Sequence, residues 1–171
     1  MNETIELIKS RRSIRKYKPL CPSREEIEAV VSAGVCAPSG MNMQSAIIVA
    51  VTNPEEVKTL SSLCEKVRGQ KNPYYGAPAV LLVLAETNSD YKIQDGSLVM
   101  GNLMNAAHAI GLGTCWINRL DKVFELPEGK ALLDKWGIKG QYTGIASCVI
   151  GYPDEDPQMK PRKDNYVYYV D

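Results

Sequence analysis

The sequence contains a single histidine and no excess of either charge, and each shortage excludes a class of function. Only His108 is available and no Ser-His-Asp or Cys-His arrangement is evident, so we expect no nucleophile that a histidine activates. We expect this histidine to make a hydrogen bond between packed helices. Twenty Lys and Arg residues balance twenty Asp and Glu residues. Because no net charge would attract a nucleic acid or an anionic membrane surface, neither is an expected partner.

The five cysteines are an odd number without a Cys-x-x-Cys pair, so they predict neither a disulfide framework nor a zinc site. Cys36 and Cys115 are interpreted as small apolar fillers. The N-terminus does not resemble a signal peptide, and the longest apolar runs are much shorter than a membrane span. We therefore expect a cytoplasmic protein that has no metal and no membrane-spanning segment.

Length and composition fit one globular domain over residues 1–171, with 44% hydrophobic and 23% charged residues. Capping signals, apolar periodicity and short β-branched runs predict alternating helices and strands. The expected helices cover residues 23–33, 53–67, 94–110 and 130–136, and the expected strands cover residues 47–51, 79–85, 114–117 and 145–150. Gly34 is expected to end the first helix in a left-handed conformation.

This alternation predicts a layered α/β or α+β domain. A dinucleotide-binding fold is excluded, because Gly111-Leu-Gly113 lacks a third glycine and precedes a strand, whereas the fingerprint follows one. The helix at residues 94–110 has apolar residues on nearly every face, and residues 167–170 form a strand-like aromatic tail. Both need more cover than a chain of 171 residues readily supplies, so we expect an oligomer interface.

Residues 11–15, Arg-Arg-Ser-Ile-Arg, follow a short helical segment and predict a phosphate site. Guanidinium groups bind phosphate oxygens in pairs and stay charged at neutral pH, while Ser13 and the backbone add donors. Two alternatives remain open for this stretch alone. It could be a solvated basic patch, or a nucleic-acid arm together with the cations that follow it. Only Tyr17 would supply the aromatic stacking that such an arm needs.

Three further segments have polar groups that could meet a ligand. Residues 37–44 are longer than a connecting loop needs to be, and the amides of Asn42 and Gln44 could pair with the edge of a heterocycle. The alternative for this loop is an ordinary turn. Residues 111–117 join a helix to a strand through two glycines that permit close backbone approach. Residues 159–162 place two cations around a proline, and none of the three segments is specific by itself.

Taken in this order, the four segments resemble the motifs of the nitroreductase superfamily of FMN-dependent oxidoreductases. The match spans nearly the whole chain, and the ordered set is far more specific than any one motif. The resemblance implies an α+β, nitroreductase-like sandwich in which helices flank a central mixed sheet and two chains form an intertwined homodimer. It also implies two FMN sites at the dimer interface and chemistry that the FMN performs without a catalytic side chain.

The resemblance further implies which side chains bind FMN. Those that would hold its phosphate come from both ends of the chain and are Arg11, Arg12, Ser13, Lys160 and Arg162. Arg15 would reach the ribityl and pyrimidine side of the cofactor. Because hydride transfer to flavin N5 leaves negative charge at N1 and the C2 carbonyl, this fixed cation would stabilise the reduced anion.

Other segments would surround the flavin ring. The partner subunit would contribute four residues of its 37–44 loop, which are Pro38, Ser39, Gly40 and Asn42. The strand after the glycine-bearing turn would run near the flavin, with a backbone N–H facing N5, through Cys115, Trp116, Ile117 and Asn118. Either Gln70 or Asn72 would approach the pyrimidine edge.

The implied activity is the reduction of FMN by NADH or NADPH, followed by the reduction of a nitroaromatic, a quinone or a similar planar acceptor. One slot would serve both ligands in turn, so ping-pong kinetics are expected. Many relatives are longer and have inserted helices beside the pocket, where this chain has little beyond residues 68–75, so an open pocket is expected. Two alternatives remain: a protein that binds or delivers flavin without efficient turnover, and a family member with another electron donor.

Overall fold

The computed structural model describes residues 2–171. Four strands form one sheet in the order β1-β2-β4-β3, and every neighbouring pair is antiparallel. Their bounds are Ala46–Val51 for β1, Ala79–Glu86 for β2, Gly113–Ile117 for β3 and Tyr142–Gly151 for β4. The prediction of an α+β fold is confirmed. The prediction of a mixed sheet is wrong within a single chain, because all strands of its sheet are antiparallel. The one parallel pairing among the described residues is the isolated bridge between Ser13 and Thr114.

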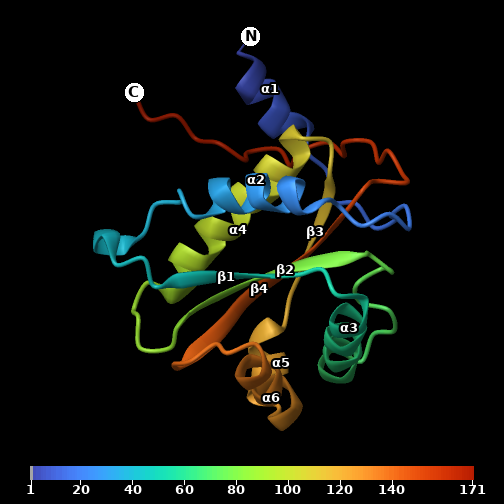
Figure 1. Ribbon diagram of the computed structural model, residues 1–171. Helices are drawn as coiled ribbons and strands as arrows, with labels where there is room; N and C mark the ends of the chain where they lie inside the picture. Colours follow the sequence, from blue (N-terminus) through green and yellow to red (C-terminus); the bar gives the residue numbers. More distant parts are fainter. Residues whose placement is uncertain (1) are drawn as a thin grey trace.

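The antiparallel order follows from the position of the connecting helix. Helix α3, Pro54–Arg68, lies beside one end of the sheet (Figure 1). The chain therefore enters β2 at the end of the sheet where it left β1, and Val51 pairs with Val80. Although β1, α3 and β2 follow one another in the sequence, they do not form the parallel β-α-β crossover that such an order often produces.

Helices cover both faces of the sheet (Figure 1). Helices α2, Arg24–Gly34, and α4, Lys92–Ala109, lie on one face. The opposite face is covered by α3 together with α5, Leu120–Glu125, and α6, Pro127–Lys135. Alternate side chains of β2 point to opposite faces, so Leu82 and Leu84 join the core under α3 whereas Leu81 and Val83 join the core under α2 and α4. This two-sided burial of the central strand makes the sandwich.

Side-chain caps begin α2 and α3 at the predicted residues. The Ser23 hydroxyl accepts from Glu26 N at 3.2 Å, and the Glu26 carboxylate accepts from Ser23 N at 2.7 Å. Asn53 Oδ1 accepts from Glu55 N at 2.9 Å at the start of α3. Such caps pair the amides that the first turn of a helix leaves without partners.

Some of the expected helices differ from the structure. Gly34 is the last residue of α2 and is not left-handed, because its role is close packing: a Cβ there would lie 2.5 Å from Leu103 Cδ2. Helix α5 is an addition that the periodicity did not predict, and α6 begins at Pro127 rather than at residue 130. Helix α1, Glu3–Ser10, is the short helical segment expected before residue 11. No helix within residues 2–171 has both the length and the apolar character needed to cross a bilayer.

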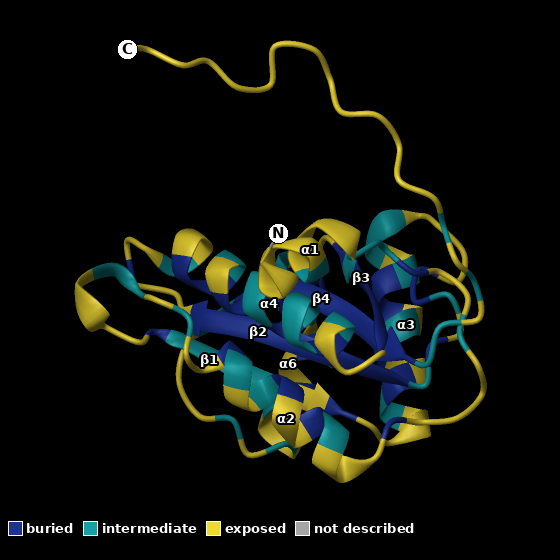
Figure 2. Ribbon diagram, turned by 90° about the horizontal axis from the view of Figure 1, so that it is seen from above, coloured by how far each residue is buried: buried dark blue, intermediate teal, exposed yellow. Residues whose placement is uncertain are grey.

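The C-terminal tail leaves the body of the molecule. Residues 155–171 contain no helix and no strand, and Figure 2 shows this segment extending away from the layers. Its large aromatic and apolar side chains are exposed, from 57% for Met159 to 97% for Val170. The strand expected at residues 167–170 is therefore absent from one chain, because nothing in that chain pairs with it.

Candidate functional site

The basic stretch at residues 11–15 lies along the outer edge of β3. Ile14 N donates to Thr114 O at 2.9 Å, next to the parallel bridge of Ser13 with Thr114. Gly113 permits this approach, because a Cβ there would lie 2.8 Å from Ile14 Cγ1. The first predicted phosphate segment is thus fixed by backbone contacts with the predicted flavin strand.

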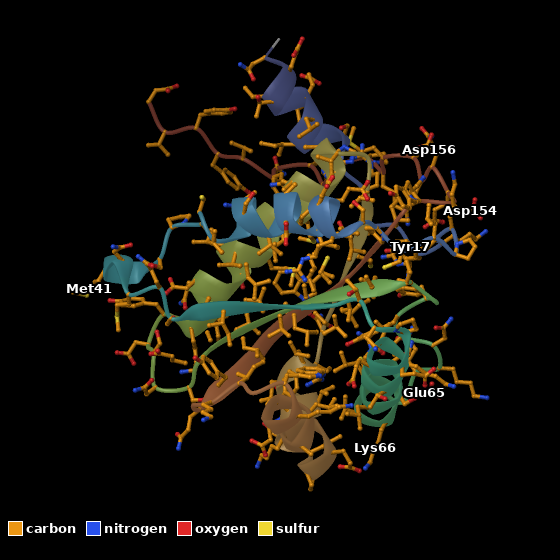
Figure 3. The ribbon with its side chains drawn as sticks, viewed as in Figure 1. Tyr17, Met41, Glu65, Lys66, Asp154 and Asp156 are labelled. Atoms are coloured by element: carbon orange, nitrogen blue, oxygen red, sulfur yellow. The ribbon has the colours of Figure 1, made fainter. Side chains whose placement is uncertain are left out.

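The segment after β4 holds the same stretch from its other side. Tyr17 forms an antiparallel bridge with Pro153, and Figure 3 shows Tyr17 beside Asp154. The Glu155 carboxylate accepts a hydrogen bond from Arg15 N. Because the stretch is held on both sides, its backbone is positioned before any ligand binds.

Arg11 and Arg12 differ in what their guanidinium groups contact. Arg12 Nη1 donates to the carbonyl oxygens of Lys9 and Arg11, both at 2.7 Å, and so bonds to the backbone at the end of α1. Arg11 Nη1 is buried and has no hydrogen-bond partner among the described residues. An unsatisfied buried donor costs about 1–3 kcal/mol, so this nitrogen is suited to bind an oxygen atom of a ligand.

The positive charges of three arginines act on the Cys115 thiol. Burial raises the pKa of Cys115, and the positive charges of Arg15, Arg11 and Arg68 oppose this rise. Arg15 also lies over the Tyr75 ring, with 6.0 Å between the guanidinium carbon and the ring centroid. Three segments that are far apart in the sequence therefore meet at one cationic place.

Arg68 joins two of the segments that were predicted to run beside a flavin. Its Nη2 donates to Gln70 Oε1 at 2.8 Å, and its Nη1 lies 3.4 Å from Asn118 O. Trp116 Nε1 donates to Asn118 Oδ1 at 2.6 Å. Asn72 instead accepts from a backbone N–H of its own turn at 3.1 Å. Arg68 thus links Gln70 to Asn118, which Trp116 also contacts, and Asn72 takes no part in these hydrogen bonds.

Strand β3 has one edge without a neighbouring strand, because it pairs only with β4. Thr114 O faces this outer edge, where it accepts from Ile14 N. Successive residues of a strand direct their backbone groups to opposite edges, so Trp116 N–H also faces outward. The Ile117 side chain, in contrast, is buried in the core. At this edge β3 therefore offers the Trp116 N–H to a ligand.

The 37–44 loop lies at the opposite end of the molecule from the basic stretch. Figure 3 shows Met41 at one end and Tyr17 at the other. Within one chain, the loop residues that were predicted to bind FMN therefore do not reach the arginines. These loop residues are Pro38, Ser39, Gly40 and Asn42. Asp95, a buried residue in the first turn of α4, holds the loop by accepting from Gly40 N at 2.9 Å.

Lys160 and Arg162 lie on the exposed C-terminal tail. Within residues 2–171 neither side chain makes a hydrogen bond or an ion pair, so nothing joins them to the basic stretch. The two groups of cations that were predicted to share one phosphate are thus not in contact in one chain.

Backbone strain is concentrated in these same segments. The described non-glycine residues with positive φ are Met41, Asn42, Gln44, Asn72, Tyr75, Arg119 and Asn165. They fall in the 37–44 loop, in the turn after α3, directly after Asn118, or shortly after Arg162. Such conformations cost about 1–3 kcal/mol each and are often kept at functional sites.

His108 makes the expected hydrogen bond between helices. Its Nε2 lies 2.8 Å from Ser10 Oγ and so joins α4 to the end of α1. Burial, followed by the charges of Arg11 and Arg12, lowers the pKa of His108. The histidine borders a pocket of about 260 Å³ between these helix ends and residues 153–157.

Sequence reasoning gave no role to four residues of the site: Arg68, Tyr75, Asp95 and Glu155. Only Asp95 had a signal, because a carboxylate among the apolar positions of a buried helix needs a partner. Arg68 ends a helix and Glu155 lies in an acidic segment, where such charges are common.

The chain matches a family model described as the nitroreductase family over residues 8–68 and 56–152. A relative from Vibrio harveyi, an NADPH-flavin oxidoreductase, is 28% identical over 191 residues, which cover 98% of this chain and 72% of that protein. An FMN reductase (NADPH) from Bacillus subtilis is 28% identical over 192 residues, which cover 99% of this chain and 73% of that protein.

Solved structures agree with the sequence relatives. The crystal structure of a nitroreductase with bound FMN from Bacteroides fragilis has a TM-score of 0.91 and 27% identity, covering all of both chains. A nitroreductase with bound FMN from Desulfitobacterium hafniense has a TM-score of 0.90 at 22% identity, which bears on the fold alone. Because the family model matches well over half of the chain, this protein belongs to the nitroreductase family.

Proposed function

We propose that this protein is an FMN-dependent oxidoreductase that uses NADH or NADPH to reduce nitroaromatics, quinones or similar planar acceptors by a ping-pong mechanism. The named activities of its relatives and the FMN bound by a structural relative support the proposal. The observation in this chain that carries it is the buried, unpaired Nη1 of Arg11. We also propose that the protein is cytoplasmic, because its five free cysteines suit a reducing compartment. We further propose that it forms a homodimer.

The residues of the basic stretch fit the FMN phosphate. Arg11 has a free donor, and Ser13 lies beside it on the outer edge of β3. Charge-assisted hydrogen bonds to a phosphate would satisfy that donor. Arg12 Nη1 already donates to backbone carbonyls. We therefore expect Arg12 to attract the phosphate through its charge and not through a hydrogen bond from Nη1.

The remaining contacts suit the flavin ring. When bound, FMN supplies the redox chemistry, and the chain supplies position and charge. Arg15 would stabilise negative charge on the ring, because Tyr75 lies under its guanidinium and Glu155 holds its backbone. Trp116 N–H, on the outer edge of β3, would donate to the ring. A single ring face would then take the nicotinamide and the acceptor in turn.

A second copy of the chain would complete the site. Met41 of the 37–44 loop lies at the opposite end of the molecule from Tyr17, which follows the basic stretch, so the amides of this loop would reach a flavin at the arginines of a partner (Figure 3). Strand β1 has a free edge, and the exposed tail from Tyr166 to Val170 has the aromatic and β-branched residues that suit strand addition. We propose that each tail covers the β1 edge of the other chain.

Titration with FMN tests this function. The purified protein should be yellow, and the FMN-free protein should quench the fluorescence of added FMN. Arg162→Ala should raise the Kd for FMN by about 10-fold, because Arg162 occupies the motif position. The neighbouring substitution Lys163→Ala should change it by no more than about twofold. Equal Kd values for the two variants would count against the phosphate assignment, and an unchanged FMN spectrum would refute the cofactor.

The single histidine tests where the phosphate binds. Burial and two arginines lower the pKa of His108, so a bound phosphate should raise this pKa by offsetting Arg11 and Arg12. NMR titration of the imidazole over about pH 5–8 measures the shift, with riboflavin, which lacks the phosphate, as the control. If FMN and riboflavin give the same curve, the phosphate binds elsewhere.

The same shift makes the stability of the FMN-free protein depend on pH. The pKa of His108 is lower in the folded chain than in the unfolded chain, so protons favour unfolding. This contribution to stability is present above about pH 6.5 and is lost as the pH falls through the lowered value.

A further inference from the structure

We propose that Arg68 is the positioning residue of the flavin-ring site and that it aims the amide donors of Gln70 at the pyrimidine edge of the flavin. The proposal rests on the proposed function, because it requires that FMN binds beside Arg15. It gives a role to a residue outside the four motifs. It also decides between Gln70 and Asn72, which the motifs leave open.

The contact between Arg68 and Gln70 fixes the direction of the amide. Arg68 Nη2 and Gln70 Oε1 are 2.8 Å apart. A guanidinium has donors only, so the amide atom that meets it must be the carbonyl oxygen. The amide nitrogen is then turned away from Arg68 and has no hydrogen-bond partner within residues 2–171. Both of its N–H donors are free for a ligand.

Asn72 is committed to a turn instead. Its Oδ1 accepts from Gly76 N at 3.1 Å, and its backbone N donates to Glu65 Oε2 at 3.3 Å. Its backbone is left-handed, with a φ of 48°. Asn72 lines a different cavity, of about 480 Å³, together with Pro19 and Lys58 and with none of the arginines. Its amide oxygen therefore maintains the turn, and its side chain borders a cavity that none of the arginines lines.

Arg68 lies where the flavin ring is proposed to bind. Its Nη1 is 3.4 Å from Asn118 O, just beyond β3, and Asn118 is held by Trp116 Nε1 at 2.6 Å. The charge of Arg68 also acts on the Cys115 thiol, as does the charge of Arg15. One guanidinium thus connects Gln70 to the end of the strand that would run past the ring.

A helix cap directly after Arg68 fixes the main chain that leads to Gln70. Helix α3 ends at Arg68, and Gly69 caps it with a φ of 66° while its N–H donates to Glu65 O at 2.8 Å. The backbone of Gln70, two residues beyond Arg68, is therefore held in place by this cap. A lysine at this position would keep a charge near the end of α3, but it lacks the planar fork that meets Gln70 and Asn118 together.

Near-isosteric substitutions test the proposal through the Kd for FMN, measured by fluorescence titration of the FMN-free full chain. Gln70→Glu keeps an oxygen toward Arg68 but replaces the donors with an acceptor, so the Kd should rise by about 10-fold or more. Asn72→Asp keeps the oxygen that accepts from Gly76 N, so the Kd should change by no more than about twofold. Arg68→Lys should raise the Kd by about fivefold, because it frees the Gln70 amide to rotate.

Thermal unfolding of the same FMN-free variants separates positioning from a merely structural role. Gln70→Glu should keep or raise Tm, since a carboxylate can pair with Arg68, and yet lose FMN affinity. Lowered Tm values with unchanged Kd values would show that Arg68 only stabilises the fold. A larger loss of affinity in Asn72→Asp than in Gln70→Glu, or an unchanged Kd in Arg68→Lys, would overturn the proposal. If the unsubstituted protein does not bind FMN, the proposed function is overturned as well. FMN titration of the unsubstituted protein distinguishes this outcome from the others.

Discussion

Replacing Arg11 by methionine should raise the Kd for FMN by about 10- to 100-fold, the largest loss expected from one side chain of the site. Arg11 Nη1 is buried without a partner in the FMN-free chain, so its charge-assisted hydrogen bond forms only when the phosphate binds. Methionine is a flexible apolar side chain that can fill the space. The free energy of unfolding of the FMN-free protein should stay the same or rise, because an unsatisfied donor is removed.

Arg24→Met is the matched control for this substitution. Arg24 is an exposed arginine on α2 that pairs with Glu28 at 2.6 Å, so its loss should change the Kd for FMN by no more than about twofold. Isothermal titration calorimetry measures Kd, and urea unfolding of the FMN-free variants measures stability. An Arg11 variant that binds FMN as tightly as the unsubstituted protein would show that Arg11 does not hold the phosphate. A variant that loses its fold would contradict the expectation that the free energy of unfolding stays the same or rises.

Deleting residues 164–171 should convert the proposed homodimer into a monomer and weaken FMN binding. The deletion removes the exposed side chains from Tyr166 to Val170, which we propose to cover the β1 edge of the other chain. Loss of the partner would also remove the 37–44 loop that is proposed to meet the flavin. Sedimentation velocity at micromolar concentration measures the mass, and FMN titration of the same samples measures the affinity.

Removal of Asp171 alone is the control for this deletion, because it takes away no apolar side chain. That variant should remain a dimer with unchanged FMN affinity. A protein that lacks residues 164–171 and is still a dimer with unchanged affinity would refute the tail exchange. If the unsubstituted protein is itself a well-folded monomer that binds FMN, the homodimer is refuted too.

Local chemistry made much of the fold predictable. The caps at Ser23 and Asn53 mark the starts of α2 and α3, and β2 is apolar from Ala79 to Ala85 because helices cover both of its faces. Strand direction was not predictable, because it depends on where α3 packs against the sheet and no local pattern reports such a contact. Helix α5 has only six residues, too few to show a helical period.

The site was predictable where its residues form a continuous motif. Residues 11–15 lie against β3, next to the glycine-bearing turn that the ordered motifs include. The role proposed for Arg68 could not be found in the same way, because it depends on contacts with residues 2 and 50 positions away. A basic residue in the last turn of a helix is ordinary, since it interacts favourably with the helix dipole. Only the folded chain shows which acceptors its guanidinium meets.

Anaerobic stopped-flow reduction of the FMN-loaded protein tests the central claim most directly. NADH or NADPH should bleach the absorbance of the bound flavin much faster than that of free FMN, and a quinone or nitroaromatic mixed in next should restore it. The rate of the first step should not depend on the acceptor, as ping-pong kinetics require. If neither nicotinamide bleaches bound flavin faster than free FMN, the oxidoreductase proposal is contradicted. A flavin-delivering protein or an enzyme with another electron donor would then explain the site better.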